Sequence, residues 1–249
     1  MPSGRLLQSL IPLPPLEVQK EIVAEVEGYH KVIIGARGVL DNYRPHIPIH
    51  PDWPVLELGE IADVQLGKML DQAKHTSGRL LSYARNVSVR WGSIDTHDLP
   101  QMYFEDDELE RFGLRQGDVL VCEGGEPGRA AVWGGSIPDL KYQKALHRVR
   151  FKVPYEPTLL VFFLQGMAGT DQFRGWLSGT TIKHLTLDSF KKLRVPLPPL
   201  DKQQAIVAEI EAEQALVAHN RELITRFELK IQDTLARVWG EEETVVPEA

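Results

Sequence analysis

The sequence predicts an α+β fold: a mixed, strand-rich domain flanked by two long α-helices that are able to form an antiparallel coiled coil. Two observations predict it. A Pro-rich start followed by an amphipathic helix occurs twice, at residues 11–33 and 195–217, with a constant offset of 184 residues. Between the two copies, short β-type runs alternate with Gly and Pro turn signals. The intervening segment is therefore interpreted as a domain inserted between two related helices.

The first helix belongs to a predicted helical region at residues 11–47. It should begin near Glu17, because the prolines before it cannot continue a helix backwards. It should end by Arg44, because Pro45 disfavours a helical conformation in the residue before it. This region is predicted to supply one of the two coiled-coil helices.

The inserted domain is predicted at residues 48–194. Strands are expected in four runs of β-type residues, at 80–89, 118–121, 130–133 and 145–152. A helix is expected over residues 158–177, and Asp188 is expected to act as the N-cap of a short helix before the second copy. The domain is thus predicted to mix strands and helices.

The second helical region is predicted at residues 195–240, with a helix from Lys202 to Trp239 and a disordered acidic tail at 241–249. Apolar residues recur every seventh position in both helices, as in a coiled-coil seam. The residues predicted to pair the helices are Val26, Ile33, Leu40, Ile210, Val217, Ile224, Ile231 and Val238. Packing on the domain core would be the usual role of one such stripe, but two related helices can also pair with each other or with helices of another chain.

The composition indicates a cytoplasmic protein without a membrane segment. The 249 residues are 43% hydrophobic, enough for a sizeable core, and the single cysteine, Cys122, excludes an intrachain disulfide. No apolar run reaches the roughly 20 residues of a membrane span. The net charge of −7 arises mostly in residues 201–249, where five Lys and Arg face eleven Asp and Glu. A basic patch can therefore exist in the domain.

The residues from Ser178 to Glu211, SGTTIKHLTLDSFKKLRVPLPPLDKQQAIVAEIE, resemble the exit of a target recognition domain into the conserved helical region of type I restriction-modification specificity subunits. The stretches PDWPVLELGEIADVQLGKML, LRQGDVLVCEGGEPGRAAVW and YQKALHRVR are similar to other parts of such a domain. The resemblance implies recognition of one half of a bipartite double-stranded DNA site, with the helices setting the spacing.

The resemblance also implies partners. These are methyltransferase (M) subunits, a restriction (R) subunit reached through the complex, and a second recognition domain. The second domain would come from a homodimer or a second half-subunit, or the chain is the C-terminal part of a larger protein whose preceding domain leaves a remnant tail at residues 1–10. No cofactor is expected in this chain, and S-adenosylmethionine is expected on the methyltransferase.

DNA contact requires cations for phosphates and planar or amide groups for base edges. The domain carries both kinds, and any single cation among them could equally be a solvated surface charge. His147 is expected to be a structural histidine. The candidate DNA-binding residues are Lys68, Lys74, Arg85, Asn86, Arg90, Arg129, Gln143, Lys144 and Arg148, with strand alternation placing Gln143 and Lys144 on opposite faces.

Two alternatives remain open. Asp118 and the run Asp139-Leu140-Lys141, helped by Glu123 or Glu126, loosely match a Mg-dependent nuclease. The long helices alone would also suit an adaptor that does not bind DNA. Against catalysis in this chain, the sequence has no phosphate-binding loop, dinucleotide fingerprint or adenine-methylation motif, and we predict no catalytic residue and no metal site.

Overall fold

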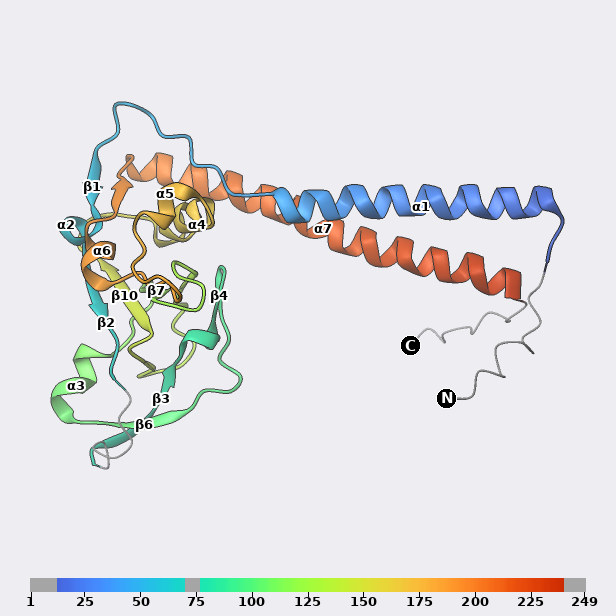
Figure 1. The fold of residues 1–249 in the computed structure, drawn as a ribbon. Helices are drawn as coiled ribbons and strands as arrows, with labels where there is room; N and C mark the ends of the chain where they lie inside the picture. The colour runs from blue at the N-terminus through green and yellow to red at the C-terminus, as the bar shows by residue number, and fades with distance from the viewer. Residues whose placement is uncertain (1–12, 70–76, 240–249) are drawn as a thin grey trace. The chain divides into compact units, whose positions relative to one another are not determined.

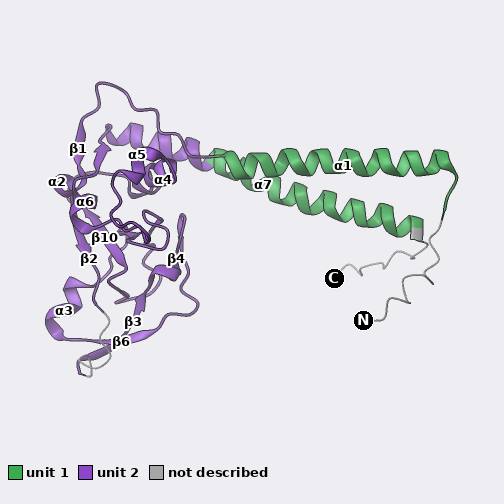
Figure 2. Cartoon of the chain, in the orientation of Figure 1, with its two compact units in different colours: residues 1–43, 212–249 green, residues 44–211 purple. Residues whose placement is uncertain are grey.

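A computed structural model describes residues 13–69 and 77–239 (Figure 1). The predictions for residues 1–10, Lys74 and residues 241–249 lie outside these ranges. The described chain forms two compact units, a domain of residues 44–211 and a helical unit of residues 13–43 and 212–239 (Figure 2). The domain continues through the first turns of the last helix, beyond the boundary at 194 that the sequence suggested.

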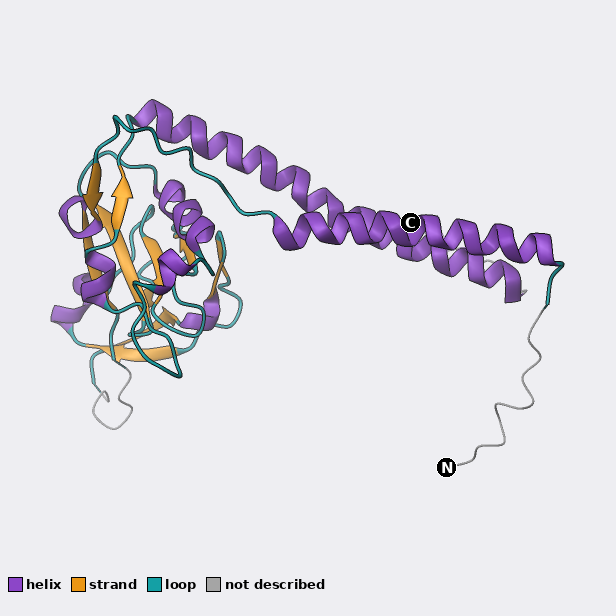
Figure 3. Ribbon diagram, turned by 45° about the horizontal axis from the view of Figure 1, so that its top comes forward, coloured by secondary structure: helices purple, strands orange, loops and turns teal. Residues whose placement is uncertain are grey.

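The helical unit is an antiparallel pair formed by α1 (Leu16–Asn42) and the second part of α7 (Leu200–Trp239). Pro15 precedes α1, and α1 ends three residues before Pro45, close to the predicted limits. The chain forms these long helices because their apolar residues repeat with a heptad period. The prediction of two long helices flanking a strand-rich domain is confirmed (Figure 3).

The contacts between α1 and α7 show that the two helices run in opposite directions. Tyr29 packs edge-on against Phe227 with ring centroids 5.4 Å apart. Just after the C-terminal end of α1, the Tyr43 hydroxyl donates to Glu213 over 2.9 Å. The seam residues that are buried or half-buried in this unit are Val26, Ile33, Leu40, Val217, Ile224, Ile231 and Val238. The two helices therefore pair with each other within one chain.

Ile210 is a correction to the predicted seam. It is buried in the core of the domain, together with Ile206 and Val207 at the start of α7. The heptad spacing continues through Ile210, but the first turns of the helix pack on the domain, so the period alone could not show which partner buries it.

The domain is built around an antiparallel sheet with strand order β2-β10-β7-β8. Its strands are β2 (Ala62–Leu66), β10 (Leu146–Phe151), β7 (Val119–Cys122) and β8 (Ala130–Val132). Helix α4 (Pro157–Met167) contacts β8 and contributes Leu159, Leu160 and Leu164 to the main core. These apolar side chains explain why α4 is buried along most of its length.

A second, smaller core lies around the sheet β6-β3-β9, formed by β6 (Gln101–Phe104), β3 (Arg79–Ala84) and β9 (Lys141–Tyr142). The short elements nearby in the chain are the 3-10 turn η2 (Asn86–Ser88), the hairpin β4 (Val89–Arg90) and β5 (Ser93–Ile94), and helix α3 (Asp106–Arg111). The predicted strand at 80–89 is thus split by η2.

The chain enters and leaves the domain on two paired strands. β1 (Val55–Glu57) is antiparallel to β11 (Arg194–Pro196), with Leu56 opposite Val195. The short helices α2 (Leu58–Ile61) and α6 (Leu187–Lys191) adjoin this pair. The N-cap of α6 is Thr186, not Asp188, because the Thr186 hydroxyl accepts a hydrogen bond from the Ser189 N–H over 3.3 Å.

The predicted helix at 158–177 is wrong in its second half. It ends at Met167, and a separate short helix, α5 (Asp171–Arg174), follows. Gly169 interrupts the helix with φ +80, a conformation that glycine adopts readily. None of the helices among the described residues combines the length and apolarity needed to cross a membrane.

Candidate nucleic-acid interface

Five loops meet at one end of the main sheet, where β2 and β7 end and β8 and β10 begin. Glu123 N donates to Ala145 O over 3.0 Å, and Lys144 N donates to Lys68 O over 2.8 Å. We call these loops the sheet-end loops; they comprise residues 67–69, 85–92, 123–129, 143–145 and 178–184. Segments far apart in the sequence thus come together at this end of the sheet.

Asn86 and Arg129 come together in this surface, as two of the predicted DNA-binding residues. The Arg129 guanidinium donates to the Asn86 side-chain oxygen over 3.0 Å and to its backbone oxygen over 3.1 Å. The Asn86 amide in turn donates to Gly124 O over 2.7 Å. Arg129 also pairs with Glu126, which accepts a hydrogen bond from Trp91. This network fixes the shape of the glycine-rich turn.

Among the candidate cations, Arg90 and Lys144 are exposed. Neither forms an ion pair with another residue in the described part of the chain. Arg85 is half-buried and pairs with the exposed Asp98 over 3.0 Å. Gln143 is half-buried and forms an isolated β-bridge with Lys68, while Lys144 lies in the turn before β10, so the predicted alternation of Gln143 and Lys144 along a strand is wrong. Arg90 and Lys144 remain available for phosphate contact.

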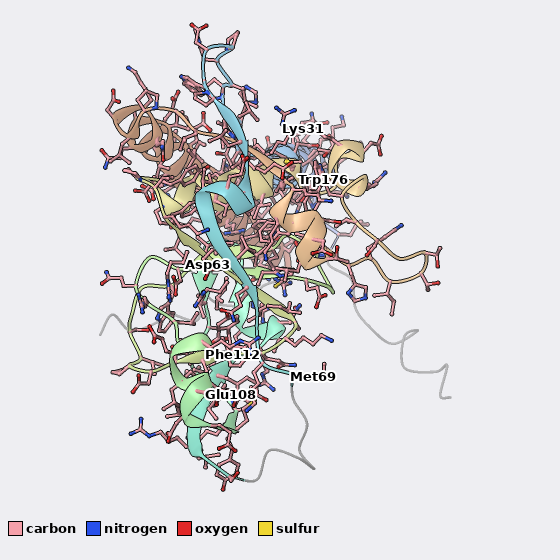
Figure 4. The ribbon with its side chains drawn as sticks, turned by 90° about the vertical axis from the view of Figure 1, so that its left-hand side faces the viewer. Lys31, Asp63, Met69, Glu108, Phe112 and Trp176 are labelled. Carbon is pink, nitrogen blue, oxygen red and sulfur yellow. The ribbon has the colours of Figure 1, made fainter. Side chains whose placement is uncertain are left out.

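The predictions for Lys68 and Arg148 as DNA contacts are wrong, because both side chains are only 3% exposed. Lys68 forms an ion pair with Glu108 and donates to Tyr103 O over 2.8 Å. Arg148 forms an ion pair with Asp63. Figure 4 labels the two acidic partners, Glu108 on α3 and Asp63 on β2. The positive charges of these two side chains are neutralised inside the domain.

The basic stretch around β10 has a structural role at the C-terminal end of α3. Lys141 donates to Leu109 O over 2.7 Å, and Arg150 donates to Gly113 O over 3.2 Å. Cations near the last carbonyl groups of a helix satisfy free acceptors and interact favourably with the helix dipole. Lys141 and Arg150 therefore have a structural role at this end of α3.

The residues of the nuclease alternative do not assemble. Both carboxylate oxygens of Asp118 accept from Arg150, at 2.7 Å each, while the Lys141 ammonium is bound to Leu109 O. Burial lowers the pKa of Lys141. Within residues 13–69 and 77–239, no group of three or more His, Cys, Asp or Glu side chains is placed to hold a metal ion. The geometry gives this alternative no support.

His147 is buried on β10, as expected of a structural histidine. Its Nε2 lies 2.7 Å from Leu185 O, so the ring donates to that carbonyl, and Nδ1 has no partner among the described residues. Burial lowers the pKa of His147 to about 4, although the bond to Leu185 partly opposes this shift. The ring is therefore neutral in the folded protein at neutral pH.

This lowered pKa predicts a loss of stability in weak acid. Unfolded His147 binds a proton near pH 6.5, while the folded protein does not until about pH 4. Between these values the free energy of unfolding should fall by about 1.4 kcal/mol per pH unit as the pH decreases. Urea unfolding at pH 7 and pH 5 measures this, with His147→Gln as the control. Parallel losses in both proteins would contradict the assignment.

One surface element was missed by the sequence analysis. Residues 178–184 form a hairpin whose ends pair through Ser178 and His184. The hairpin adjoins the glycine-rich turn, because a Cβ added to Gly124 would lie 2.9 Å from His184 Nδ1. The run SGTTIKH, which is mostly polar with one glycine and one isoleucine just before the buried Leu185, was the available signal.

The family model described as the type I restriction modification DNA specificity domain matches residues 51–225. Two curated relatives are the type I restriction enzyme MjaVIII specificity subunit of Methanocaldococcus jannaschii and the EcoBI specificity subunit of Escherichia coli. The first is 22% identical over 90% of this chain and 60% of the relative, and the second is 24% identical over 99% and 59%. The chain thus spans about three fifths of the length of these relatives.

Solved structures show a similar fold. A structure described as the basis of complex assembly and conformational transition of the type I R-M system aligns with a TM-score of 0.62 and 22% identity, over 93% of this chain and 62% of the other. The HsdS subunit of Thermoanaerobacter tengcongensis aligns with a TM-score of 0.50 and 21% identity, over 93% and 61%.

Proposed function

The chain belongs to the family of the type I restriction modification DNA specificity domain, and from this we propose that it recognises one half of a bipartite double-stranded DNA site in a type I restriction-modification complex. The sheet-end loops form the reading surface. The observation that supports this most directly is their convergence, which places the exposed residues Arg90 and Lys144 in the same group of loops as the Asn86–Arg129 network. Cations position a protein on phosphates, and a rigid turn can present its edge to the bases.

Salt dependence tests this proposal. In the full chain assembled with its methyltransferase subunits, Lys144→Gln should weaken binding to all duplexes and lower the slope of log affinity against log salt by about 1. Lys191→Gln is the matched control, because Lys191 is exposed beside Gly59, at the opposite end of β2. The measurement is fluorescence anisotropy with a labelled duplex at several salt concentrations.

Two outcomes would favour the alternatives. Absence of duplex binding by the unsubstituted assembly would indicate an adaptor that does not bind DNA. Cleavage of the duplex by the chain alone on addition of Mg²⁺ would indicate a nuclease.

We further propose that α1 receives a second recognition domain. At the start of α7, the Gln203 amide donates to Pro198 O over 2.8 Å, and its oxygen accepts from Glu156 N over 2.7 Å. Gln19, the equivalent residue of the first copy, makes the same bond to Pro14 O over 2.7 Å. Its oxygen has no hydrogen-bond partner within the described ranges.

Equivalent apolar residues of the two copies also differ in how far they are buried. Val207 is 8% exposed in the domain core, whereas Val23, its equivalent in α1, is 54% exposed. The first copy therefore carries the contact residues of the second without a domain packed on them. In this chain, the start of α7 already occupies the surface of the domain that contacts the helix. A second domain that packs on α1 must therefore have the same surface unoccupied. A second half-subunit or a domain encoded upstream can meet this condition. The same condition limits the ways in which two copies of this chain could pair as a homodimer.

The remaining assignments follow from this role. Methylation and cleavage belong to the methyltransferase and restriction subunits, with S-adenosylmethionine bound by the methyltransferase, and this chain supplies recognition and spacing. We place the assembly in the cytoplasm, which suits the single buried thiol of Cys122.

A further inference from the structure

The hairpin of residues 178–184 has a single defined shape. Ser178 N donates to His184 O and His184 N donates to Ser178 O, both over 2.9 Å. Gly179 adopts φ +91, and a Cβ at this position would lie 2.1 Å from Ile182 O. Only glycine fits such a close approach, so any other residue at position 179 would disrupt this turn. The tip is held in place by its own backbone.

The base of the hairpin is fixed to the domain core. Leu185, the next residue, is fully buried, and its N–H donates to Glu123 O over 2.7 Å. Its carbonyl accepts the bond from His147. The His184 ring lies against Gly124 on the other side. The hairpin is therefore held by the same turn that carries the Asn86–Arg129 network.

The tip has no role in the packing of the domain. All residues from 179 to 183 are exposed, and Ile182 is 65% exposed although it is a large apolar side chain. The Lys183 ammonium has no ion pair or hydrogen bond to another described residue. The carboxylate of the neighbouring turn, Glu126, is already paired with Arg129 over 2.9 Å. The exposed tip thus offers two hydroxyls, one free cation and one apolar group.

We propose that this hairpin is a DNA-reading element, in which Lys183 and the hydroxyls of Thr180 and Thr181 contact phosphates and Ile182 contacts base edges. This inference rests on the proposed function. Lysine and threonine side chains are common phosphate ligands, and an apolar side chain can contact the thymine methyl group. Anchoring matters because a rigid element loses little conformational entropy on binding. The two kinds of contact give different signatures.

The test uses the full chain assembled with its methyltransferase subunits, a duplex carrying its methylation target and an unrelated duplex. Lys183→Gln should weaken both complexes by the same factor and reduce the salt slope by about 1. Ile182→Ala should lower the ratio of target to unrelated affinity by about fivefold or more, the range expected for a lost base contact. Lys191→Gln is again the control. The melting temperatures should stay unchanged, because both substituted side chains are exposed.

The inference is overturned if Lys183→Gln has the same salt slope as the unsubstituted chain, or if Ile182→Ala leaves the affinity ratio unchanged. The inference would also be overturned if either substitution released the methyltransferase from the assembly without changing the salt slope. In that case the hairpin would contact the methyltransferase and not DNA. Failure of the unsubstituted assembly to bind the duplex would instead refute the proposed function itself, so the two failures are distinguishable.

Discussion

Replacing Asp118 by alanine is expected to lower the free energy of unfolding by about 3–5 kcal/mol. Asp118 is 2% exposed, and its two oxygens accept from Arg150 Nε and Nη2, each over 2.7 Å. One of these oxygens also accepts from Arg115 N over 2.7 Å. Removing the carboxylate leaves a guanidinium without its counter-charge in a mostly buried position. Urea unfolding at neutral pH measures the loss.

The matched control is Asp171→Ala. Its carboxylate also pairs with an arginine, Arg174, over 2.7 Å, but the side chain is 94% exposed. Exposed ion pairs contribute little, so this change should cost less than about 1 kcal/mol. Equal losses at Asp118 and Asp171 would show that burial of the Asp118–Arg150 pair has no effect on stability.

The second large effect is expected from Val207→Asp, which should destabilise the domain by more than about 4 kcal/mol. The change places a carboxylate in the core, beside the buried Ile206 and Ile210. The expected result is a domain that is largely unfolded at ambient temperature, detected as loss of the near-ultraviolet circular dichroism of its aromatic residues.

Val23→Asp tests the same substitution in the other copy of the repeat. Val23 and Val207 occupy equivalent helical positions, and the same substitution changes the helix propensity equally at both, but Val23 is exposed. The expected change is within about 0.5 kcal/mol in this chain. A large loss from Val23→Asp would mean that the first copy is already covered, which would contradict the proposal that it receives a second domain.

The two long helices could be predicted from the sequence because their signals are local. Prolines before Leu16 and after Asn42 limit α1, and the heptad stripe identifies its buried face. Ile210 escaped this reasoning because a stripe shows that a face is buried and not what buries it. The burial of Val207 is equally a property of the tertiary fold.

The candidate site could be predicted only in part, since the role of a cation depends on contacts distant in sequence. Lys68 and Glu108 are 40 residues apart, and Arg148 and Asp63 are 85 apart. The residues near Lys68 and Arg148 in the sequence do not indicate that each of them has an acidic partner in a distant part of the chain. Lys144 was expected on a strand, whereas it lies in an exposed turn. The hairpin at 178–184 was missed because its anchoring depends on Glu123, just after β7, and on His147 in β10, which are distant in sequence.

The pairing of β1 with β11 has a consequence for how such proteins can diversify. Leu56 and Val195 lie opposite each other, so a short antiparallel ladder joins the two junctions of the domain. A foreign insert with the same terminal ladder could replace residues 58–193 as a cassette, leaving both flanking segments in their native register. Recombination at these two points would then exchange one reading specificity for another in a single event.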